Sequence, residues 1–187
     1  MNLKCIDYFE CQHKKEIKKI YINSFYKDER FPFWILKHCS KEKNVTFNAI
    51  LDNDKIIGME YIINYENIAY LMYLAIDENQ RKKGYGSKIL KDLIEKYETI
   101  ILSIERPKKD LNNNKQIRKN FYLRNGFFET NKFIKDNGVE YEILCTNKNY
   151  CVTKEDLQKR YTKMTNSATM KYLIGRLFNV YNIYFIK

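Results

Sequence analysis

The chain has 187 residues, enough for one well-packed domain with a small appendage, and its 44% hydrophobic and 15% aromatic content excludes a disordered chain. It contains no apolar run of about 18 residues, so no membrane-spanning helix is expected, and its first residues lack the apolar core of a signal peptide. The formal net charge of +11 suggests nucleic-acid binding, but no recognition motif accompanies it, so nucleic acid is not an expected partner.

The first quarter of the chain predicts two helices joined by an aromatic connection. Residues 13–26 carry apolar side chains at helical spacing, and Pro32 suits the first turn of a short second helix. The aromatic residues beside that proline, Phe31, Phe33 and Trp34, are expected either in the core or in the wall of a binding cleft.

The hydrophobic period then changes from about 3.6 to about 2, which predicts three strands in succession. Residues 45–51 alternate in polarity, turn residues follow at 52–55, and residues 56–64 form the expected return strand of a hairpin. Residues 68–76 are nearly all apolar, which is typical of a central strand that is buried on both faces.

The second half of the chain alternates helical and extended patterns. These predict a helix that ends near Tyr97, a strand over 99–105, a helix over about 115–125, and a strand pair over 127–134 and 139–146. Gly126 is expected just beyond the C-cap of the second of these helices, because glycine accepts the left-handed conformation required there.

Residues 149–187 are expected to form a C-terminal helical extension packed on a main domain of residues 1–148. Thr153 and Asp156 have the spacing of a capping box, which opens one helix, and a second helical stripe includes Leu173 and Ile174. No linker rich in proline or glycine precedes the extension, and we therefore expect it to pack on the main domain.

The segment "QRKKGYGS" lies between a predicted central strand and a predicted helix, and its residue types indicate an anion-binding loop. Unpaired N–H groups and the dipole at a helix N-terminus both favour phosphate, and Gly84 and Gly86 permit close approach. The segment lacks the first glycine of a P-loop, and Ile89 takes the third glycine position of the dinucleotide fingerprint. The remaining pattern is R-x-x-G-x-G, Arg81 to Gly86, which also occurs in ordinary solvated turns.

A second motif, "FYLRNGF" at residues 121–127, lies one strand and one helix downstream. Together the two motifs resemble the GNAT superfamily of acetyl-CoA-dependent N-acetyltransferases, which carries a [QR]-x-x-G-x-[GA] pyrophosphate loop and a later F-Y-x-x-x-G-F segment. The resemblance covers roughly residues 1–146 and implies an α/β (α+β) GNAT fold, with a mixed central sheet of about six to seven strands flanked by helices. Lys115 stands where many members carry an asparagine that contacts the cofactor.

The resemblance also implies a reaction, in which the acetyl group moves from acetyl-CoA to a primary amine by direct attack in a ternary complex. Main-chain groups of Leu74, Ala75 and Ile76 would bond to the pantetheine arm, and an N–H near Ile76 would face the thioester oxygen. The implied pyrophosphate loop consists of Arg81, Lys82, Lys83, Gly84, Tyr85, Gly86 and Ser87. Tyr122 aligns with the tyrosine that protonates the leaving thiolate in relatives. Its spacing alone indicates only an aromatic side chain on the buried face of a helix.

The base that deprotonates the amine is left open between Glu60, Glu105 and water. If Glu60 or Glu105 is not the base, we expect it to be a solvent-exposed residue of its strand. Asp28, Glu29 and Arg30 lie in the connection that lines the acceptor cleft in relatives, where they either meet the substrate or face water.

Two other function classes stay open: a non-catalytic acyl-CoA-binding or sensing domain, and a nucleic-acid-binding module driven by charge. Five cysteines without a C-x-x-C spacing and only two histidines indicate neither a disulfide framework nor a metal site, so we expect a reduced, cytoplasmic, metal-free protein. The acceptor is left open between a small-molecule and a peptide amine. No membrane partner is expected, and the oligomeric state is open, with a homodimer among the alternatives.

Overall fold

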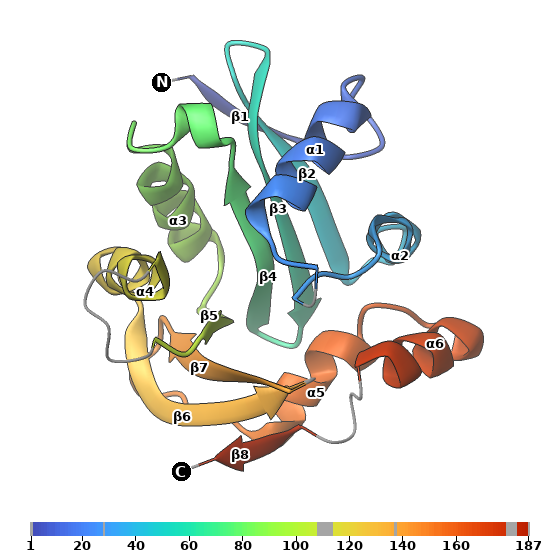
Figure 1. Ribbon diagram of the computed structural model, residues 1–187, viewed down its shortest axis with the longest axis vertical. Helices are drawn as coiled ribbons and strands as arrows, with labels where there is room; N and C mark the ends of the chain where they lie inside the picture. Colours follow the sequence, from blue (N-terminus) through green and yellow to red (C-terminus); the bar gives the residue numbers. More distant parts are fainter. Residues whose placement is uncertain (1, 28, 108–113, 137, 179–182, 187) are drawn as a thin grey trace.

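The computed structural model describes residues 2–27, 29–107, 114–136, 138–178 and 183–186. Asp28, one of the three residues singled out in the connection between the first two helices, lies outside the described residues. Figure 1 shows a central sheet with helices on both of its faces. Within the described ranges, no helix is long and apolar enough to cross a membrane.

The described residues form eight strands, six α-helices and one short 3-10 helix. The strands are β1 (Leu3–Asp7), β2 (Val45–Asp52), β3 (Lys55–Tyr65), β4 (Ile68–Ile76), β5 (Thr99–Glu105), β6 (Phe128–Asp136), β7 (Val139–Cys145) and β8 (Tyr184–Ile186). The helices are α1 (Lys14–Ser24), α2 (Phe33–Cys39), the 3-10 helix η1 (Glu78–Gln80), α3 (Tyr85–Lys96), α4 (Asn114–Arg124), α5 (Lys154–Thr162) and α6 (Ala168–Phe178).

All eight strands belong to one sheet, in the order β1-β2-β3-β4-β5-β7-β6-β8. Strands β4 and β5 form the parallel pair, and the other pairs are antiparallel. A mixed sheet flanked by helices confirms the predicted fold class, although the strand count is higher than the six to seven expected.

The two outermost strands, β1 and β8, are the ones that the sequence patterns do not predict. Both are short edge strands with largely exposed side chains, so neither shows the alternation in polarity that identifies β2. Main-chain pairing defines them instead, β1 on β2 and β8 on β6. The C-terminal extension therefore contributes a strand to the sheet as well as two helices.

The sheet separates two hydrophobic cores. Helices α1, α2, α5 and α6 bury apolar side chains against one face, and α3 and α4 pack on the other. Along β4, Tyr73 and Ala75 belong to the first core, while Leu74 and Ile76 pack against the second. This alternation confirms the prediction that β4 is a central strand covered on both faces.

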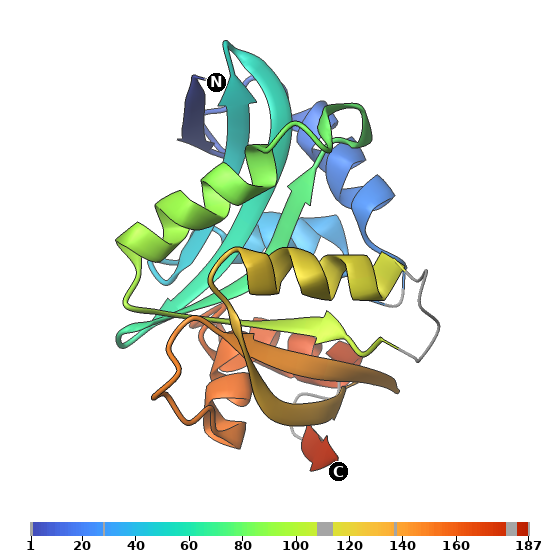
Figure 2. The ribbon, with the colours of Figure 1, turned by 90° about the vertical axis from the view of Figure 1, so that its left-hand side faces the viewer.

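Strands β4 and β5 run side by side for only three residue pairs, from Ile68↔Thr99 to Tyr70↔Ile101. Beyond these pairs β4 continues along β3, and β5 continues along β7, so the two strands separate. Met72 has no register partner on β3, which places a β-bulge just beyond the last β4–β5 pair. We call the region between residues 71–76 and 102–105 the β4–β5 wedge; α4 runs alongside β5, next to α3 (Figure 2).

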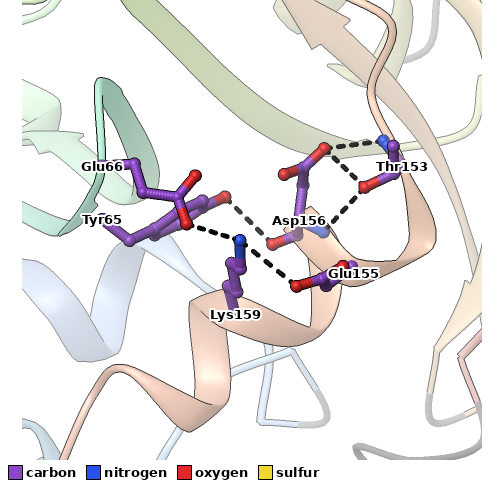
Figure 3. A network of polar contacts seen from close by, with 6 residues as sticks. All are labelled: Tyr65, Glu66, Thr153, Glu155, Asp156 and Lys159. Carbon is purple, nitrogen blue, oxygen red and sulfur yellow. Dashed lines mark hydrogen bonds and ion pairs between the residues drawn. The ribbon is translucent and has the colours of Figure 1, made fainter.

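The C-terminal extension is held on the β3–β4 turn through the first turns of α5 (Figure 3). Thr153 Oγ1 accepts from the N–H of Asp156 at 3.2 Å, and the Asp156 carboxylate accepts from the N–H of Thr153 at 2.7 Å, which confirms the predicted capping box. Tyr65 Oη donates to the main-chain oxygen of Asp156 at 3.0 Å, and Lys159 Nζ lies 2.8 Å from the Glu66 carboxylate. The division of the chain at residue 148 stays a prediction.

Candidate active site

The segment between β4 and α3 presents a row of main-chain donors. Asp77 Oδ1 accepts from the N–H of Asn79 at 3.0 Å, and Lys82 and Gly84 then take left-handed φ values of 62° and 82°. In the part of the chain that the structure describes, none of the N–H groups of residues 82–87 has a hydrogen-bond partner. Such a row at a helix N-terminus favours a bound anion, because the donors and the helix dipole act together.

The two glycines of this loop have different structural roles. Gly84 is the N-cap of α3 at φ 82°, a conformation that residues with a Cβ rarely adopt. A Cβ on Gly86 would lie 2.9 Å from Cζ of Phe121 on α4. Gly86 therefore lets α3 approach α4, which is a packing reason for this glycine beside the expected clearance for a phosphate.

The loop cations are partly engaged within the protein. Arg81 donates from Nε to the main-chain oxygen of Ile76 at 3.1 Å and from Nη2 to Ser24 Oγ at 3.5 Å. Lys83 donates to the side-chain oxygen of Gln80 at 2.8 Å. Arg81 thus ties the loop to the end of β4 and to α1, and its charge remains beside the unpaired N–H groups.

Tyr85 contributes to this loop through its main chain, because its side chain is buried. The Tyr85 hydroxyl donates to Asp52 Oδ2 at 2.6 Å and so anchors α3 on the end of β2. This hydrogen bond lowers the pKa of the Asp52 carboxyl. Ser87, by contrast, is exposed on the first turn of α3.

The three β4 residues expected to contact the pantetheine arm, Leu74, Ala75 and Ile76, lie on one side of the wedge. They pair with residues 58–60 of β3 along one edge, while the β4–β5 register ends before them. A Cβ on Gly58 would lie 2.5 Å from the main-chain oxygen of Ala75, so β3 and β4 are tightly apposed here. Among the described residues, the edge of β4 that faces β5 therefore has no strand partner at these three positions.

Tyr122 lies in the last turn of α4, half-buried beside the second core. Its ring makes edge contacts with Phe121 and Phe127, at centroid distances of 5.3 and 5.4 Å. Within the described residues no group hydrogen-bonds to its hydroxyl. Burial raises the pKa of Tyr122, and the nearby Arg118 charge acts in the opposite direction, so the phenol is a proton donor at neutral pH.

The end of α4 confirms the prediction for Gly126. Gly126 has φ 89°, its N–H donates to Leu123 O at 3.4 Å, and the N–H of Phe127 donates to Tyr122 O at 3.2 Å. These two bonds are those of a Schellman motif. The motif fixes the main chain of Tyr122 and places Phe127 against its ring.

Two carboxyl groups meet at the open end of the wedge. Glu105, the last residue of β5, forms an ion pair with Lys115 of α4. Glu29, from the connection between α1 and α2, lies beside Glu105. Burial raises the pKa of Glu29, and Glu105 raises it further, whereas Arg118 opposes the shift. Tyr73 Oη donates to the main-chain oxygen of Glu29 at 3.1 Å, which ties this connection to β4.

Glu60, the other base considered from the sequence, lies elsewhere. It is 3% exposed, accepts from Asn48 Nδ2 at 2.8 Å, and packs on the face of the sheet that α3 covers. Burial raises the pKa of its carboxyl. Of the two base candidates, the structure brings only Glu105 to the open end of the wedge, and the sequence expectation that Glu60 is solvated is wrong.

Sequence reasoning missed one residue of this site, Arg118, and one contact, that of Glu29 with Glu105. Arg118 lies one helical turn before Tyr122, and that i, i+4 spacing was the available signal. The proximity of Glu29 to Glu105 left no signal, because the two residues are far apart in the chain. No group of three potential metal ligands occurs among the described residues.

The sequence matches one family model directly. Residues 43–129 match the acetyltransferase (GNAT) domain family. This stretch runs from just before β2 into β6 and contains both motifs of the sequence. No curated protein matches the chain at a significant level.

Solved structures resemble the whole fold at low sequence identity. A GNAT-family protein from Bacteroides thetaiotaomicron is 22% identical, with a TM-score of 0.66, and the match covers 94% of this chain and 96% of that protein. An aminoglycoside 6'-N-acetyltransferase complexed with coenzyme A is 15% identical, with a TM-score of 0.61 and coverages of 78% and 96%. A chain of the NatC complex bound to Gag peptide and CoA is 17% identical, with a TM-score of 0.57 and coverages of 78% and 98%.

The Bacteroides protein differs from the other two in how far the likeness reaches. Its match extends into the C-terminal extension, whereas the other two cover a share equivalent to the main domain. Family model, sheet topology and the β4–α3 loop agree with one another. Residues 43–129 therefore match the acetyltransferase (GNAT) domain family, and the fold of the described residues is that of solved GNAT acetyltransferases.

Proposed function

We propose that this protein is an acyltransferase that moves an acetyl group from acetyl-CoA to a primary amine. One observation carries the proposal: directly beyond the edge of β4 lies the row of N–H groups at residues 82–87, and neither the row nor that edge has a main-chain partner among the described residues. The pyrophosphate of coenzyme A suits the N–H row, because each main-chain donor points a partial positive charge at it. The amide groups of pantetheine suit a strand edge, because they can continue its main-chain hydrogen bonding.

The thioester end of the cosubstrate would lie along the same edge of β4. Leu74, Ala75 and Ile76 line the pantetheine path, and the bulge at Met72 lies at its end toward the last β4–β5 pair. An N–H near Ile76 would face the thioester oxygen. Preorganised N–H groups of this kind stabilise the charge that develops on a carbonyl oxygen.

The proton balance involves Tyr122 and the Glu29–Glu105 pair. An ammonium acceptor loses one proton through this carboxyl pair to solvent, and its nitrogen then attacks the thioester carbon. The new C–N bond forms, the C–S bond breaks, and the nitrogen gives up its second excess proton. Tyr122 donates a proton to the departing thiolate and is reprotonated by the one that leaves nitrogen. Attack in a ternary complex requires only that amine and thioester be held together.

The acceptor class is proposed as a small-molecule or peptide amine. The two relatives bound to CoA differ in this respect, since one is an aminoglycoside acetyltransferase and the other holds a Gag peptide. We also propose a reducing, cytoplasmic location, because five cysteines without a C-x-x-C spacing indicate no disulfide framework. A homodimer stays among the alternatives for the assembly.

The first test is calorimetric titration with acetyl-CoA and with coenzyme A. We expect both to bind with similar strength, because the phosphates carry most of the contact. The second test measures thiol release from acetyl-CoA across a panel of amines. Binding without turnover on any amine would support the non-catalytic acyl-CoA-binding alternative, and absence of binding would remove the proposal.

A further inference from the structure

One face of α4 carries three functional side chains in a row. Lys115, Arg118 and Tyr122 are spaced three and four residues apart, so they lie on the same side of the helix. Lys115 contacts Glu105 at the end of the wedge, which orients this face toward the open end. Arg118 is thereby placed between the ion pair and the phenol assigned to proton transfer.

Arg118 is half-buried, yet its guanidinium makes no hydrogen bond and no ion pair within the described residues. This is unusual for a partly desolvated arginine, because the guanidinium carries five N–H donors that need acceptors. The other basic residues on this part of α4, Lys115 and Lys119, both have carboxylate partners. Of the three basic residues at 115, 118 and 119, only Arg118 therefore lacks a partner within the described residues.

The carboxyl group of Glu29 lies near Arg118 without forming an ion pair with it. Glu29 and Arg118 each lie within the electrostatic field of the other, and no ion pair within 4 Å joins them. The Glu29 carboxyl lies instead beside the carboxyl of Glu105. A cation and a carboxyl pair thus face each other at the open end of the wedge, with Tyr122 on the side of the cation.

We propose that the acceptor is an amine that also bears a carboxylate, the class of the α-amino acids. Its carboxylate would bind the planar guanidinium of Arg118 in the two-point geometry that arginine favours, and its ammonium would meet the Glu29–Glu105 pair. In such a molecule one carbon separates the two charges, which matches opposite charges that are near but not paired. This inference rests on the proposed acetyl transfer, and it restricts the acceptor of that reaction.

The experiment compares matched acceptors in the thiol-release assay. Each set contains an amino acid, its carboxamide and the corresponding decarboxylated amine, for an aromatic, an aliphatic and a basic side chain. For at least one set we expect kcat/KM to be about 10²-fold higher for the amino acid than for its two analogues, the scale on which charge-assisted bonds discriminate. Equal use of all three members in every productive set would overturn the inference.

The variant Arg118→Gln tests the residue itself. We expect it to lower kcat/KM for the amino acid to about the value for the carboxamide, a loss of about 10²-fold, and to leave the calorimetric affinity for acetyl-CoA unchanged. Arg124→Gln is the matched control, because Arg124 is an exposed arginine at the end of the same helix. Weaker acetyl-CoA binding by Arg118→Gln would show that Arg118 serves the cosubstrate, and the inference would fail.

Calorimetry with acetyl-CoA also distinguishes a failure of the amino-acid inference from a failure of the proposed acetyl transfer. If wild-type protein binds acetyl-CoA but acetylates carboxylate-free amines as well as amino acids, the inference fails and the proposed function stands. If acetyl-CoA binds and no amino acid is acetylated, the inference fails again. If acetyl-CoA does not bind at all, the proposed function fails and the inference falls with it.

Discussion

Two polar clusters occupy the two ends of the β4–β5 wedge, and they are built in opposite ways. At the apex, Arg160 of α5 hydrogen-bonds to Tyr70 Oη on β4 and, at 3.0 Å, to Ser103 Oγ on β5. Arg160 also pairs with Asp136, which accepts from Tyr161 Oη at 2.5 Å. The Arg160 and Asp136 side chains are only 4% and 7% exposed. Tyr70 is the last β4 residue paired with β5, so Arg160 joins the strands where they part.

At the open end, the groups are half-buried and several are unpaired. Arg118 and the Tyr122 hydroxyl have no hydrogen-bond partner in the described part of the chain, and the Glu29 carboxyl lies beside another carboxyl. Arginine, tyrosine and carboxyl side chains occur at both ends, and their burial decides whether they stabilise the fold or stay accessible. Polar groups that are removed from water must bond to one another, and at the apex these bonds stabilise the fold. Two buried atoms there, Asp136 Oδ1 and Arg160 Nε, still lack partners among the described residues. Where polar groups stay near water they remain available to a ligand.

The largest expected effect is at the apex, with Arg160→Met. Removal of the guanidinium leaves Asp136 buried with only the Tyr161 hydroxyl bonded to it, so we expect the free energy of unfolding to fall by about 3–5 kcal/mol. Urea unfolding followed by circular dichroism measures this loss. The double variant Arg160→Met, Asp136→Asn should recover part of it, because the buried negative charge is then removed.

The matched control is the neighbouring residue on α5. Lys159 pairs with the exposed Glu66 and Glu155 carboxylates, so Lys159→Met should cost much less stability than Arg160→Met. If Arg160→Met and Lys159→Met lowered the free energy of unfolding equally, burial would not explain the role of the apex cluster.

The next effect is at the open end, with Tyr122→Phe. If the phenol is the proton donor, kcat should fall by about 10²-fold, since only the hydroxyl is removed. Burial raises the pKa of this phenol above its usual 10.0, so its ionisation should not limit the wild-type rate at neutral pH. Stopped assays of thiol release give kcat, and calorimetry should show unchanged affinity for acetyl-CoA.

Thermal unfolding checks that Tyr122→Phe acts on rate and not on the fold. The hydroxyl has no partner in the described residues, so stability should change by less than about 1 kcal/mol. Tyr172→Phe on α6, where the side chain is 69% exposed, serves as the control. Full activity of Tyr122→Phe would assign Tyr122 to packing and the thiolate proton to another donor.

A smaller effect is expected where α3 meets α4, with Gly86→Ala. The new Cβ would lie 2.9 Å from Cζ of Phe121, so the ring must move, at a cost of about 1–3 kcal/mol. The double variant Gly86→Ala, Phe121→Leu should cost less than the sum of the single variants. Additive losses in urea unfolding would show that the two residues do not press on each other.

The smallest effect concerns the pH dependence of stability at Glu29. The folded protein raises the pKa of this carboxyl above its usual 4.5, so the folded state favours its proton. That contribution is complete below pH 4.5 and is lost as pH rises through the raised pKa of the folded state. Glu29→Gln has no such titration, so in urea unfolding at a series of pH values the variant should gain stability relative to wild type above pH 4.5. A constant difference across the series would show that Glu29 does not titrate abnormally.

The sequence by itself determined the elements whose signals are local. The polarity alternation of β2, the Schellman end of α4 at Gly126 and the capping box at Thr153 each depend on residues within a few positions of one another. The glycine-containing loop between β4 and α3 belongs to the same group, because strand, loop and helix are consecutive in the chain. Six central strands followed from these patterns.

Only the tertiary structure decided how distant residues meet. Strands β1 and β8 exist because a main-chain edge was available for them, which requires no side-chain pattern. The meeting of Glu29 with Glu105, and of Arg160 with Asp136, depends on strand register and helix packing over long separations in sequence. The separation of β4 from β5 likewise depends on the partners at their other edges, β3 and β7, and on the arginine that α5 places at the apex.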